Sequence, residues 1–264
     1  MKNILVTGAC GGMGRATVAA LRDKGCRVFA LDLTAGEASK GVITIVCDIT
    51  SSESLAAALA CVREHTDSLD AILHFAGIYM LDSLVEMDES SFRRIFDVNL
   101  HGAFLVNRTF LPLLSRGSRI IITTSELAPL DPLPFTGIYA VTKGALDKYA
   151  YSLRMELQLL GIKVSVLRAG AVKTDMLGAS TSALDRFCEK TKLYTCNAKS
   201  FKSIVNRVEA RCIPPERVAQ KCASVLEKKH PSFAYSINRT PLLLLLGILP
   251  KRLQLWAVRM ILKK

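Results

Sequence analysis

A chain of 264 residues, half of them hydrophobic, can bury a substantial core and needs no more than one α/β domain. The opening KNILVTG is a short apolar run that ends in a turn signal, so no secretory signal is expected. The eight scattered cysteines form no CxxC pair and show no Cys/His spacing typical of zinc. We therefore expect reduced thiols, a cytoplasmic protein and no metal site.

The formal net charge of +12 is concentrated in the C-terminal third. Residues 1–185 hold 18 basic and 19 acidic side chains, whereas residues 186–264 hold 17 basic and 4 acidic ones. Nucleic-acid binding is one interpretation of such a basic surface. No aromatic-rich or zinc-finger motif accompanies it, so we expect no nucleic-acid partner, and an anionic membrane surface is the better interpretation.

The predicted elements alternate between strand and helix from the N-terminus. Apolar runs predict strands at 3–7, 27–32, 42–48, 69–77, 118–125, 163–170 and 233–237. Helical spacing predicts helices at 14–25, 51–65, 88–115 and 137–160, the third interrupted late by Pro112 and the fourth ending at Gly161. Strands with near-continuous apolar character, separated by helices, predict an α/β fold with a doubly wound parallel sheet covered on both faces.

A glycine-rich loop, TGACGGMG (7–14), lies between the first strand and the first helix. Glycines at 8, 12 and 14 let the backbone turn tightly and approach a pyrophosphate, which then rests on the helix N-terminus. Tight strand-to-helix turns also use glycine. The position at the first junction of a repeating pattern nevertheless favours a Rossmann-type sheet that binds a dinucleotide. The predicted contacts in this loop are Gly8, Cys10, Gly12, Met13 and Gly14.

Asp32 ends the second predicted strand, 18 residues after Gly14. A carboxylate there can accept hydrogen bonds from the adenine ribose hydroxyls and would repel a 2′-phosphate. A simple turn aspartate is the alternative. No basic residue lies between Thr7 and Gly14, so both features favour NAD over NADP. Asp48 ends the third strand and could reach the adenine amino group. Other predicted contacts at these strand ends are Leu33, Cys47, Ile49, Phe75, Ala76 and Gly77.

The stretch FTGIYAVTKGALDKYA (135–150) places Tyr139 and Lys143 four residues apart, on one face of a helix. A nearby cation favours the phenolate, so Lys143 would lower the pKa of Tyr139 towards neutrality and prepare it for proton transfer. With 6 Tyr and 17 Lys in the chain, about 0.4 such pairs are expected by chance, so the pair alone is a weak signal.

Taken in order, these motifs resemble those of the short-chain dehydrogenase/reductase family. The resemblance covers about residues 2–176, with a weaker echo at CIPPERVAQ (212–220). It rests on the glycine loop, the aspartate of the second strand, DVN (97–99), a serine that ends the fifth strand, Tyr-x-x-x-Lys and a glycine turn after the sixth strand. The order of the motifs makes the match specific.

The resemblance implies a set of catalytic roles. Tyr139 is then the acid/base, Lys143 lowers its pKa and holds the nicotinamide ribose, and Ser125 orients the substrate oxygen. Asn99 matches the member thought to bind a water that links Lys143 to solvent. The segment RAGAVKT (168–174) matches the turn that contacts the nicotinamide amide, with contacts at Gly170, Val172 and Thr174.

Three departures from the family pattern stand out. HFAG (74–77) replaces the usual NNAG, so local packing must differ, and His74 is interpreted as a strand histidine rather than a catalyst. Ala169-Gly170 replaces Pro-Gly, which keeps the glycine and loses some rigidity. The interval from Ser125 to Tyr139 is 14 residues, one more than expected, and the loop 126–134 could absorb the extra residue. Thr124 is the competing candidate for the serine role.

The C-terminal part divides into a substrate lid and a tail. Residues 1–240 are predicted to form the dehydrogenase domain, with a lid at about 175–215, and 241–264 an apolar and basic helical extension. The run 242–249 is too short to span a bilayer. If 250–264 is helical, its apolar stripe contains Leu253, Trp256, Ala257, Met260 and Ile261, and its cationic stripe Arg252, Arg259 and Lys263. Such a helix could lie on anionic lipid, or dock on the substrate cleft or on a second subunit.

A similar leucine-rich, proline-broken, basic C-terminus is found in hydroxysteroid and retinol dehydrogenases of the family. The resemblance implies an NAD(H)-dependent oxidoreductase that interconverts a secondary alcohol and a ketone on a lipophilic substrate such as a hydroxysteroid. We also expect a homo-oligomer, either dimer or tetramer, and peripheral membrane contact through 241–264 remains one of the alternatives for the tail. The alternatives are a dehydrogenase/reductase of short 3-hydroxy or 3-oxo acids, and a dinucleotide-binding regulatory protein. The complete set of Ser125, Tyr139 and Lys143 argues against a regulator, because a sensor needs no proton donor.

Overall fold

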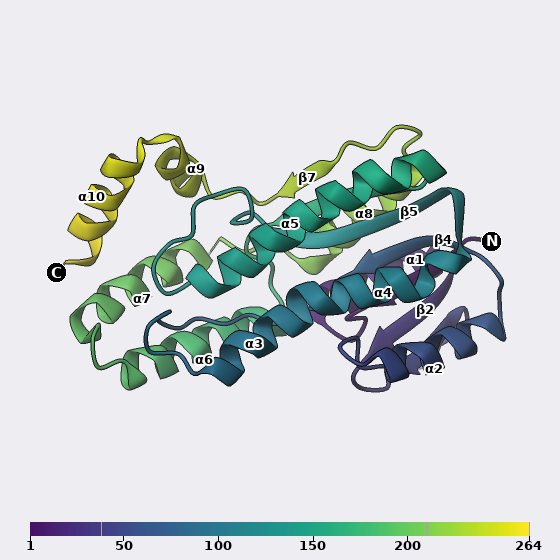
Figure 1. Cartoon of the computed structure of the whole chain (residues 1–264), viewed down its shortest axis with the longest axis horizontal. Coiled ribbons are helices and arrows are strands. Elements are labelled where there is room, and N and C mark those ends of the chain that lie inside the picture. The colour runs from purple at the N-terminus through teal and green to yellow at the C-terminus, as the bar shows by residue number, and fades with distance from the viewer. Residues whose placement is uncertain (38, 210, 264) are drawn as a thin grey trace.

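Seven parallel strands form one sheet in the order β3-β2-β1-β4-β5-β6-β7 (Figure 1). The computed structural model describes residues 1–37, 39–209 and 211–263, and the side chains of 175, 177–180, 208 and 209 lie outside that description. The strands are β1 (Asn3–Thr7), β2 (Arg27–Asp32), β3 (Val42–Val46), β4 (Leu69–His74), β5 (Leu114–Ser125), β6 (Lys163–Ala169) and β7 (Ala234–Ile237).

The strand order reverses between β1 and β4, which pair side by side. In open parallel sheets a crevice forms at the carboxyl ends of the strands at such a point. The central strands are buried on both faces, and Ile4, Leu5 and Val6 of β1 are fully inaccessible. The predicted doubly wound sheet is therefore confirmed, and its switch point lies beside the glycine loop.

Helices cover both faces of this sheet (Figure 1). On one face α1 (Gly12–Asp23) packs against α8 (Pro215–Glu227), and residues of both share a core with β1, β2 and β4. On the other face lie α2 (Ser52–Arg63), α4 (Gly102–Phe110) and α5 (Gly137–Leu157), whose apolar side chains share a second core with the sheet. The one-turn helix η3 (Gln158–Leu160) follows α5 and ends at Gly161, whose φ of 76° is typical of a helix C-terminus.

The predicted helix over 88–115 is a series of four helical segments. They are α3 (Glu89–Phe96), a π turn η1 (Asp97–His101), α4, and a 3-10 turn η2 (Leu111–Leu113) that contains Pro112. The Asp88 carboxylate accepts a hydrogen bond from the Ser91 N–H at 2.8 Å and so caps α3. β5 begins at Leu114, four residues before the predicted start, because the chain re-enters the sheet directly after the proline turn.

Four more helices lie beyond the carboxyl ends of the strands (Figure 1). The segment predicted to be a substrate lid contains α6 (Asp175–Lys190) and α7 (Thr195–Glu209), and the tail contains α9 (Pro241–Ile248) and α10 (Lys251–Leu262). A third core joins Phe135, Phe187 and Phe201 with Leu262 of α10. The part of the lid prediction that falls on residue 210 lies outside the described residues.

The apolar stripe predicted for the tail does not face the protein. Val258 and Leu262 of α10 pack into the third core, whereas Leu253, Trp256, Met260 and Ile261 are about half exposed or more. Asn197 of α7 donates a hydrogen bond to the Leu262 carbonyl at 2.6 Å, and Lys251 pairs with Asp131. These contacts at the two ends of α10 fix its rotation, so the helix docks on the enzyme through a different face from the one expected.

His74 ends β4 and is a buried structural residue, as the sequence indicated. Its Nε2 atom donates a hydrogen bond to the Asn107 Oδ1 atom at 3.0 Å, and Asn107 donates in turn to the Tyr149 hydroxyl at 3.1 Å. This network ties the central strand to α4 and α5 in place of the family asparagines. Burial lowers the pKa of His74 from 6.5 to about 4, because the imidazolium would lose its hydration.

We expect His74 to make the protein less stable in mild acid. Between pH 6.5 and about 4 the unfolded chain binds the proton and the folded chain does not, so the free energy of unfolding falls as pH falls through this window. The loss should reach roughly 3 kcal/mol by pH 4. Urea unfolding from pH 7 to pH 4 should show a shallower decline for His74→Asn than for wild type. Parallel pH curves for the two proteins would contradict this assignment.

Candidate active site

The glycine loop and the end of β4 approach each other closely. Gly8 has a φ of +66°, and a Cβ there would lie 2.4 Å from the Ala76 nitrogen. A Cβ at Gly14 would lie 2.0 Å from the Gly8 carbonyl oxygen. Both positions therefore require glycine, and the loop keeps its backbone open to a ligand at the N-terminus of α1.

A cavity of about 300 Å³ lies at this loop, at the carboxyl ends of β1 to β4. Its lining includes most of the predicted cofactor contacts, namely Gly8, Gly12, Met13, Gly14, Asp32, Leu33, Cys47, Asp48, Ile49, Phe75, Ala76, Gly77 and Thr174. It also includes six residues that sequence reasoning missed, namely Gly11, Leu31, Thr50, Ile78, Val98 and Met176. The structure thus brings most of the dispersed predicted contacts together around one cavity.

Among the predicted contacts of the glycine loop, Cys10 does not line the cavity, and its backbone positions Asp32 instead. The Cys10 N–H donates to the Asp32 Oδ2 atom at 2.9 Å, and the Leu33 N–H donates to Oδ1 at 2.8 Å. These two bonds fix the carboxylate at the cavity rim. Each carboxylate oxygen can accept a further hydrogen bond, so Asp32 can still receive two hydroxyl donors.

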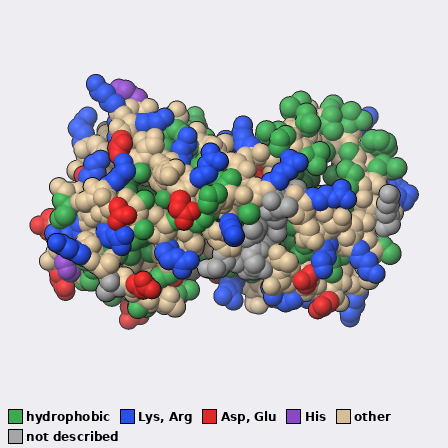
Figure 2. Space-filling view, turned by 180° about the vertical axis from the view of Figure 1, so that it is seen from behind, with side chains coloured by type: hydrophobic (Ala, Val, Ile, Leu, Met, Phe, Trp, Pro, Cys, Tyr) green, Lys and Arg blue, Asp and Glu red, His purple; other side chains and the backbone are tan. Residues whose placement is uncertain are grey.

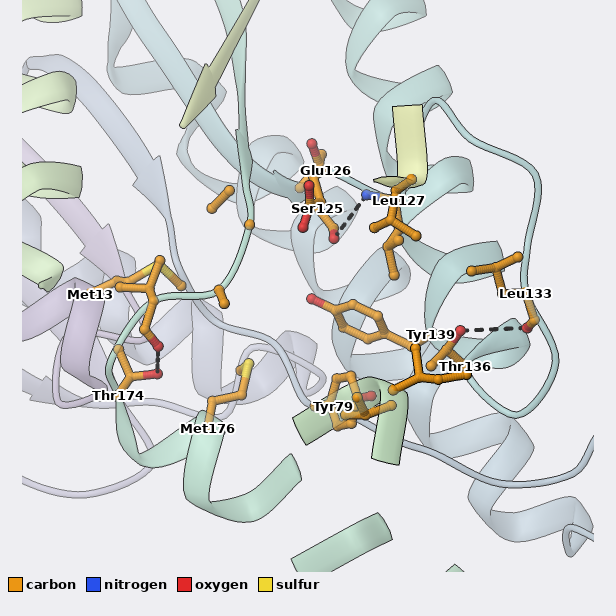
Figure 3. Close-up of a pocket in the computed structure, with 18 of the residues that line it drawn as sticks. Met13, Tyr79, Ser125, Glu126, Leu127, Leu133, Thr136, Tyr139, Thr174 and Met176 are labelled. Atoms are coloured by element: carbon orange, nitrogen blue, oxygen red, sulfur yellow. Dashed lines mark hydrogen bonds between the residues drawn. The ribbon is translucent and has the colours of Figure 1, made fainter. Parts of the chain in front are cut away.

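A second cavity of about 210 Å³ adjoins the first and shares Met13, Thr174 and Met176 with it. Ser125 and Tyr139 line it, and the hydroxyl of Tyr139 points towards Ser125 (Figure 3). Gly170 and Val172, two of the predicted nicotinamide contacts, line this cavity rather than the first. The remaining walls are mainly apolar and come from the loop after β5, α7 and α9, through Leu127, Leu133, Phe201, Ile204, Val205 and Leu243.

The surroundings of Tyr139 raise the pKa of its hydroxyl, mainly because the protein displaces water from around it. The ring of Tyr79, whose centroid is 4.8 Å away, adds to the increase, and the interaction with Ser125 opposes it. The pKa of Tyr139 is therefore raised in the protein, and the predicted shift towards neutrality is not observed. The helical spacing correctly predicted that Tyr139 and Lys143 lie close together, but it could not predict that both side chains are buried.

Lys143 lies deep beneath the cavities and is 5% exposed. Its Nζ atom donates to the Thr123 carbonyl at 3.4 Å and lies 5.7 Å from the centre of the Tyr139 ring. Burial lowers the pKa of Lys143 to about 8. The ammonium therefore remains mostly charged at pH 7 and loses its charge as the pH rises through about 8.

Asn99 lies in the π turn η1 and holds the segment that follows β4. Its Oδ1 atom accepts from the Ile78 N–H at 2.8 Å, and its Nδ2 atom donates to the Ile78 carbonyl at 3.0 Å and to Thr142 at 3.2 Å. A Cβ at Gly77 would lie 3.1 Å from Asn99 Oδ1 and 3.2 Å from Lys143 Nζ. Asn99 and Lys143 therefore flank one glycine, and Asn99 positions the backbone at the cavity floor.

A buried ion pair locks α5 against the sheet. Arg168 of β6 forms two parallel hydrogen bonds with Asp147 of α5, at 2.7 and 2.9 Å. Thr124 also donates to Asp147, at 3.2 Å. Thr124 also lines the second cavity, but its hydroxyl is bonded to Asp147, whereas the Tyr139 hydroxyl points towards Ser125. This geometry favours Ser125 over the competing candidate.

β5 ends at Ser125 and α5 begins at Gly137, so a loop over 126–136 separates Ser125 from the helix that carries Tyr139. Phe135 in this loop has a φ of 65°, which costs a non-glycine residue about 1 kcal/mol or more. Its ring packs against Phe187 and Phe201 at centroid distances of 4.6 and 5.3 Å. The loop conformation is therefore held by the third core.

Two contacts replace the rigidity that a proline before Gly170 would supply. A Cβ at Gly170 would lie 2.0 Å from the Asn238 carbonyl oxygen, and the Gly170 N–H donates to Ile237 at 2.9 Å. The Asn238 side chain then binds the Ala171 carbonyl at 2.8 Å. The end of β7 and the residue after it thus hold the turn at 170–171 in place.

Glu126 is a cavity residue that sequence reasoning missed. Its carboxylate accepts from the Thr240 N–H at 2.6 Å and from the Thr240 hydroxyl at 2.9 Å. It therefore ties the start of the tail to the residue that follows Ser125. An acidic residue directly before the apolar run 127–130 was the available signal.

A separate group of polar side chains lies at the end of α2. Side-chain atoms of Cys61, Glu64 and His65 that could bind a metal lie within 4.8 Å of one another. The His65 Nδ1 atom is hydrogen-bonded to the Cys61 carbonyl at 3.0 Å. These residues line neither of the two cavities described above, so they add nothing to this site.

Comparison with known proteins points to one family. A family profile described as short chain dehydrogenase matches residues 2–185. Versicolorin reductase 1 of Aspergillus parasiticus is 32% identical over 186 residues, which cover 66% of this chain and 71% of that protein. Retinol dehydrogenase 16 of Mus musculus is 30% identical over 259 residues, covering 89% and 80%.

Two further similarities extend this comparison. The 17-beta-hydroxysteroid dehydrogenase type 6 of Homo sapiens is 30% identical over 201 residues, covering 72% of this chain and 63% of that protein. The crystal structure of a short chain dehydrogenase family protein from Francisella tularensis superposes with a TM-score of 0.75 at 22% identity, covering 90% of this chain and 97% of that one. At this identity the structural likeness establishes the fold.

Proposed function

The chain belongs to the short-chain dehydrogenase family and is an oxidoreductase of CH–OH groups, and we propose that it uses NAD(H) to interconvert a secondary alcohol and a ketone on a lipophilic substrate. A hydroxysteroid is the first candidate. The observation that carries the proposal is the position of Tyr139 and Ser125, in an apolar cavity that adjoins the nucleotide cavity. The glycine loop and the carboxylate of Asp32 fit the dinucleotide that this fold binds.

In the proposed mechanism the dinucleotide, when bound, supplies or accepts the hydride. Tyr139 gives its proton to the substrate oxygen during ketone reduction and takes it back during alcohol oxidation. Ser125 donates a hydrogen bond to the same oxygen and orients the substrate. Lys143 offsets the negative charge that forms on Tyr139, and Asn99 holds the cavity floor in place. The apolar walls exclude water from the proton transfer.

The lining of the substrate cavity supports a lipophilic substrate. Its described lining residues include no Lys or Arg, and Glu126 is its acidic group. A short 3-oxo or 3-hydroxy acid would place its carboxylate near Glu126 without a cation to balance it, which is unfavourable. The names of two relatives, a hydroxysteroid dehydrogenase and a retinol dehydrogenase, agree with a lipophilic alcohol.

A substrate panel tests this proposal. Purified protein is incubated with NAD(H) or NADP(H) and with steroids, retinol, or short hydroxy and oxo acids, and the nicotinamide absorbance is followed. We expect turnover with at least one steroid or retinoid and with NAD(H). Turnover confined to the short acids would favour the alternative substrate class. Tight dinucleotide binding without turnover of any alcohol or ketone would favour a regulatory protein.

We also propose that the protein forms a homo-oligomer, either a dimer or a tetramer, in the cytoplasm or at a membrane surface. The outer faces of α4 and α5 expose Phe104, Val141, Tyr151 and Met155. A contact through these faces would bury them, and it would leave the cavities free because neither is lined by these residues. Sedimentation velocity of the wild type and of Tyr151→Asp would test it, with a shift to the monomer expected for the variant.

Ketone reduction should decline as pH rises through about 8. Burial lowers the pKa of Lys143 to about 8, so above this pH the lysine loses its charge and no longer offsets the phenolate formed on Tyr139. We expect the plot of kcat/KM against pH to bend near 8 for wild type and for Lys148→Met, an exposed lysine of the same helix. The bend should be absent from Lys143→Met. A bend at the same pH in Lys143→Met would assign it to another group.

A further inference from the structure

The two tail helices expose a continuous apolar surface, seen at the upper right of Figure 2. We call it the C-terminal patch and define it by eight side chains that are between 49 and 79% exposed, namely Leu242, Leu245, Ile248, Leu253, Leu255, Trp256, Met260 and Ile261. Soluble monomers rarely expose a large contiguous apolar surface unless it contacts something. We therefore infer that the patch contacts another molecule or surface.

The patch belongs to a well-anchored element. Glu126 holds Thr240 at the start of α9, Asp131 pairs with Lys251 at the start of α10, and Asn197 binds the Leu262 carbonyl at its end. Val258 and Leu262 pack into the third core. The inner face of the helix pair is thus held against the protein by these contacts. The exposed leucines and Trp256 cannot fold back onto the protein without breaking them.

The charged side chains of the tail itself are all basic. Residues 241–264 contain no Asp or Glu, and Arg252, Arg259 and Lys263 are exposed beside the apolar side chains. An apolar helix face bordered by cations is the combination that binds anionic bilayers, because the apolar groups enter the acyl boundary while the cations meet the lipid phosphates.

A second copy of the chain fits this surface poorly. A two-fold contact would place the same patch on both partners, so the arginines of one copy would face those of the other. Like charges across an interface disfavour association. A bilayer with anionic headgroups avoids this repulsion and covers the same apolar side chains.

The patch also lies next to the proposed substrate cavity. Leu243 of α9 lines the cavity, whereas its neighbours Leu242 and Leu245 belong to the patch. On the other side, Phe201 of α7 lines the cavity and packs in the same core as Leu262 of α10. The tail helices are therefore a wall with the cavity on one side and the patch on the other.

We propose that the C-terminal patch binds the surface of an anionic bilayer, with α9 and α10 lying in the interface and the substrate cavity directly behind them. Binding of the patch to a bilayer would place the substrate cavity beside alcohols dissolved in lipid. Only this benefit rests on the proposed lipophilic substrate. None of the described helices is both long and apolar enough to cross a bilayer, so the contact is with one leaflet.

The single tryptophan makes the test direct, because Trp256 lies in the patch and is 62% exposed. Full-length protein is mixed with vesicles of phosphatidylcholine alone or with phosphatidylserine, and both Trp emission and flotation are measured. With anionic vesicles we expect a blue shift and co-flotation that weaken in high salt. Phosphatidylcholine alone should bind at least ~10-fold more weakly.

Paired variants separate the patch from general surface effects. Leu245→Asp with Ile248→Asp, and separately Arg252→Glu with Arg259→Glu, should each weaken binding to anionic vesicles at least ~10-fold. Leu159→Asp with Leu160→Asp is the matched control, since these leucines of η3 are 80% and 57% exposed and far along the chain from the patch. This control should bind like wild type. Circular dichroism and NAD(H) binding establish that each variant is folded.

Absence of binding to anionic vesicles, or binding that the patch variants leave unchanged, would overturn the proposal. Self-association that the patch variants abolish, without vesicle binding, would also overturn it and show that a second copy covers the patch. These assays use no substrate, so their failure leaves the oxidoreductase function standing. An inactive substrate panel with intact vesicle binding would instead contradict the proposed substrate alone.

Discussion

Tyr139→Phe should retain NAD(H) binding and lose at least ~100-fold in turnover, which is the usual contribution of general acid/base catalysis. The change removes one hydroxyl and preserves the ring that packs against Tyr79 at 4.8 Å. The cavity thus keeps its shape while the proposed proton donor is lost. Because the protein raises the pKa of this hydroxyl, the group is protonated in the free enzyme and ready to donate in the direction of ketone reduction.

The measurement is kcat for reduction of the best ketone of the panel, with the Kd for NADH determined in parallel. Tyr151→Phe is the control, since this residue lies on the same helix and is 51% exposed. We expect it to behave like wild type. Ser125→Ala should lower kcat as well, because it removes the hydrogen bond that orients the substrate oxygen. Near-normal turnover in Tyr139→Phe would remove this residue from the mechanism.

The sequence predicted the sheet well because parallel strands are buried on both faces. β1 and β2 begin and end where the apolar runs 3–7 and 27–32 do. Errors occur at the ends of strands, as at the early start of β5. The predicted strand 69–77 ends at His74, because the next three residues turn towards the glycine loop, where the Ala76 nitrogen approaches Gly8. Hydrophobic pattern marks a buried strand but not the residue at which its hydrogen bonding stops.

The residues of the candidate site could be predicted where a short local motif contains them. They could not be predicted where segments far apart in the sequence meet. The glycine loop, Asp32 and the Tyr139–Lys143 pair have local spacing that can be read directly. Phe201 of α7 and Leu243 of α9 reach the same cavity from distant parts of the chain. Apolar residues in amphipathic helices carry no local mark that distinguishes a cavity wall from an ordinary core contact.

Local sequence spacing also failed to predict the pKa of Tyr139 and the side of α10 that packs on the protein. Charge proximity along a helix predicted a lowered pKa, but displacement of water raises it, since both Tyr139 and Lys143 are surrounded by protein. Helical spacing likewise identified an apolar stripe on α10, but Asp131 and Asn197 orient the helix with Val258 and Leu262 inward. In both cases contacts made by distant residues decide the outcome.

Asp32 should make the wild-type protein bind NADH more tightly than NADPH, and Asp32→Ser combined with Leu33→Arg should shift the preference towards NADPH at least ~100-fold. The 2′-phosphate of NADPH would approach a carboxylate that two backbone N–H groups hold at the cavity rim, at 2.9 and 2.8 Å. Like charges placed side by side cost several kcal/mol, which corresponds to ~100-fold or more in affinity.

Each of the two substitutions has a structural reason. A serine at position 32 can still accept from the Cys10 N–H, so the glycine loop keeps one of its supports. Leu33 is 68% exposed, so an arginine there extends into solvent beside the cavity and supplies the cation that a 2′-phosphate needs.

Kd values for both dinucleotides, measured by calorimetry, give the preference ratio directly. Asp48→Asn is the control: Asp48 lines the same cavity, but its proposed contact is adenine, so its loss should weaken both dinucleotides equally. Tighter binding of NADPH than NADH by the wild type would show that the Asp32 carboxylate does not set the cofactor preference.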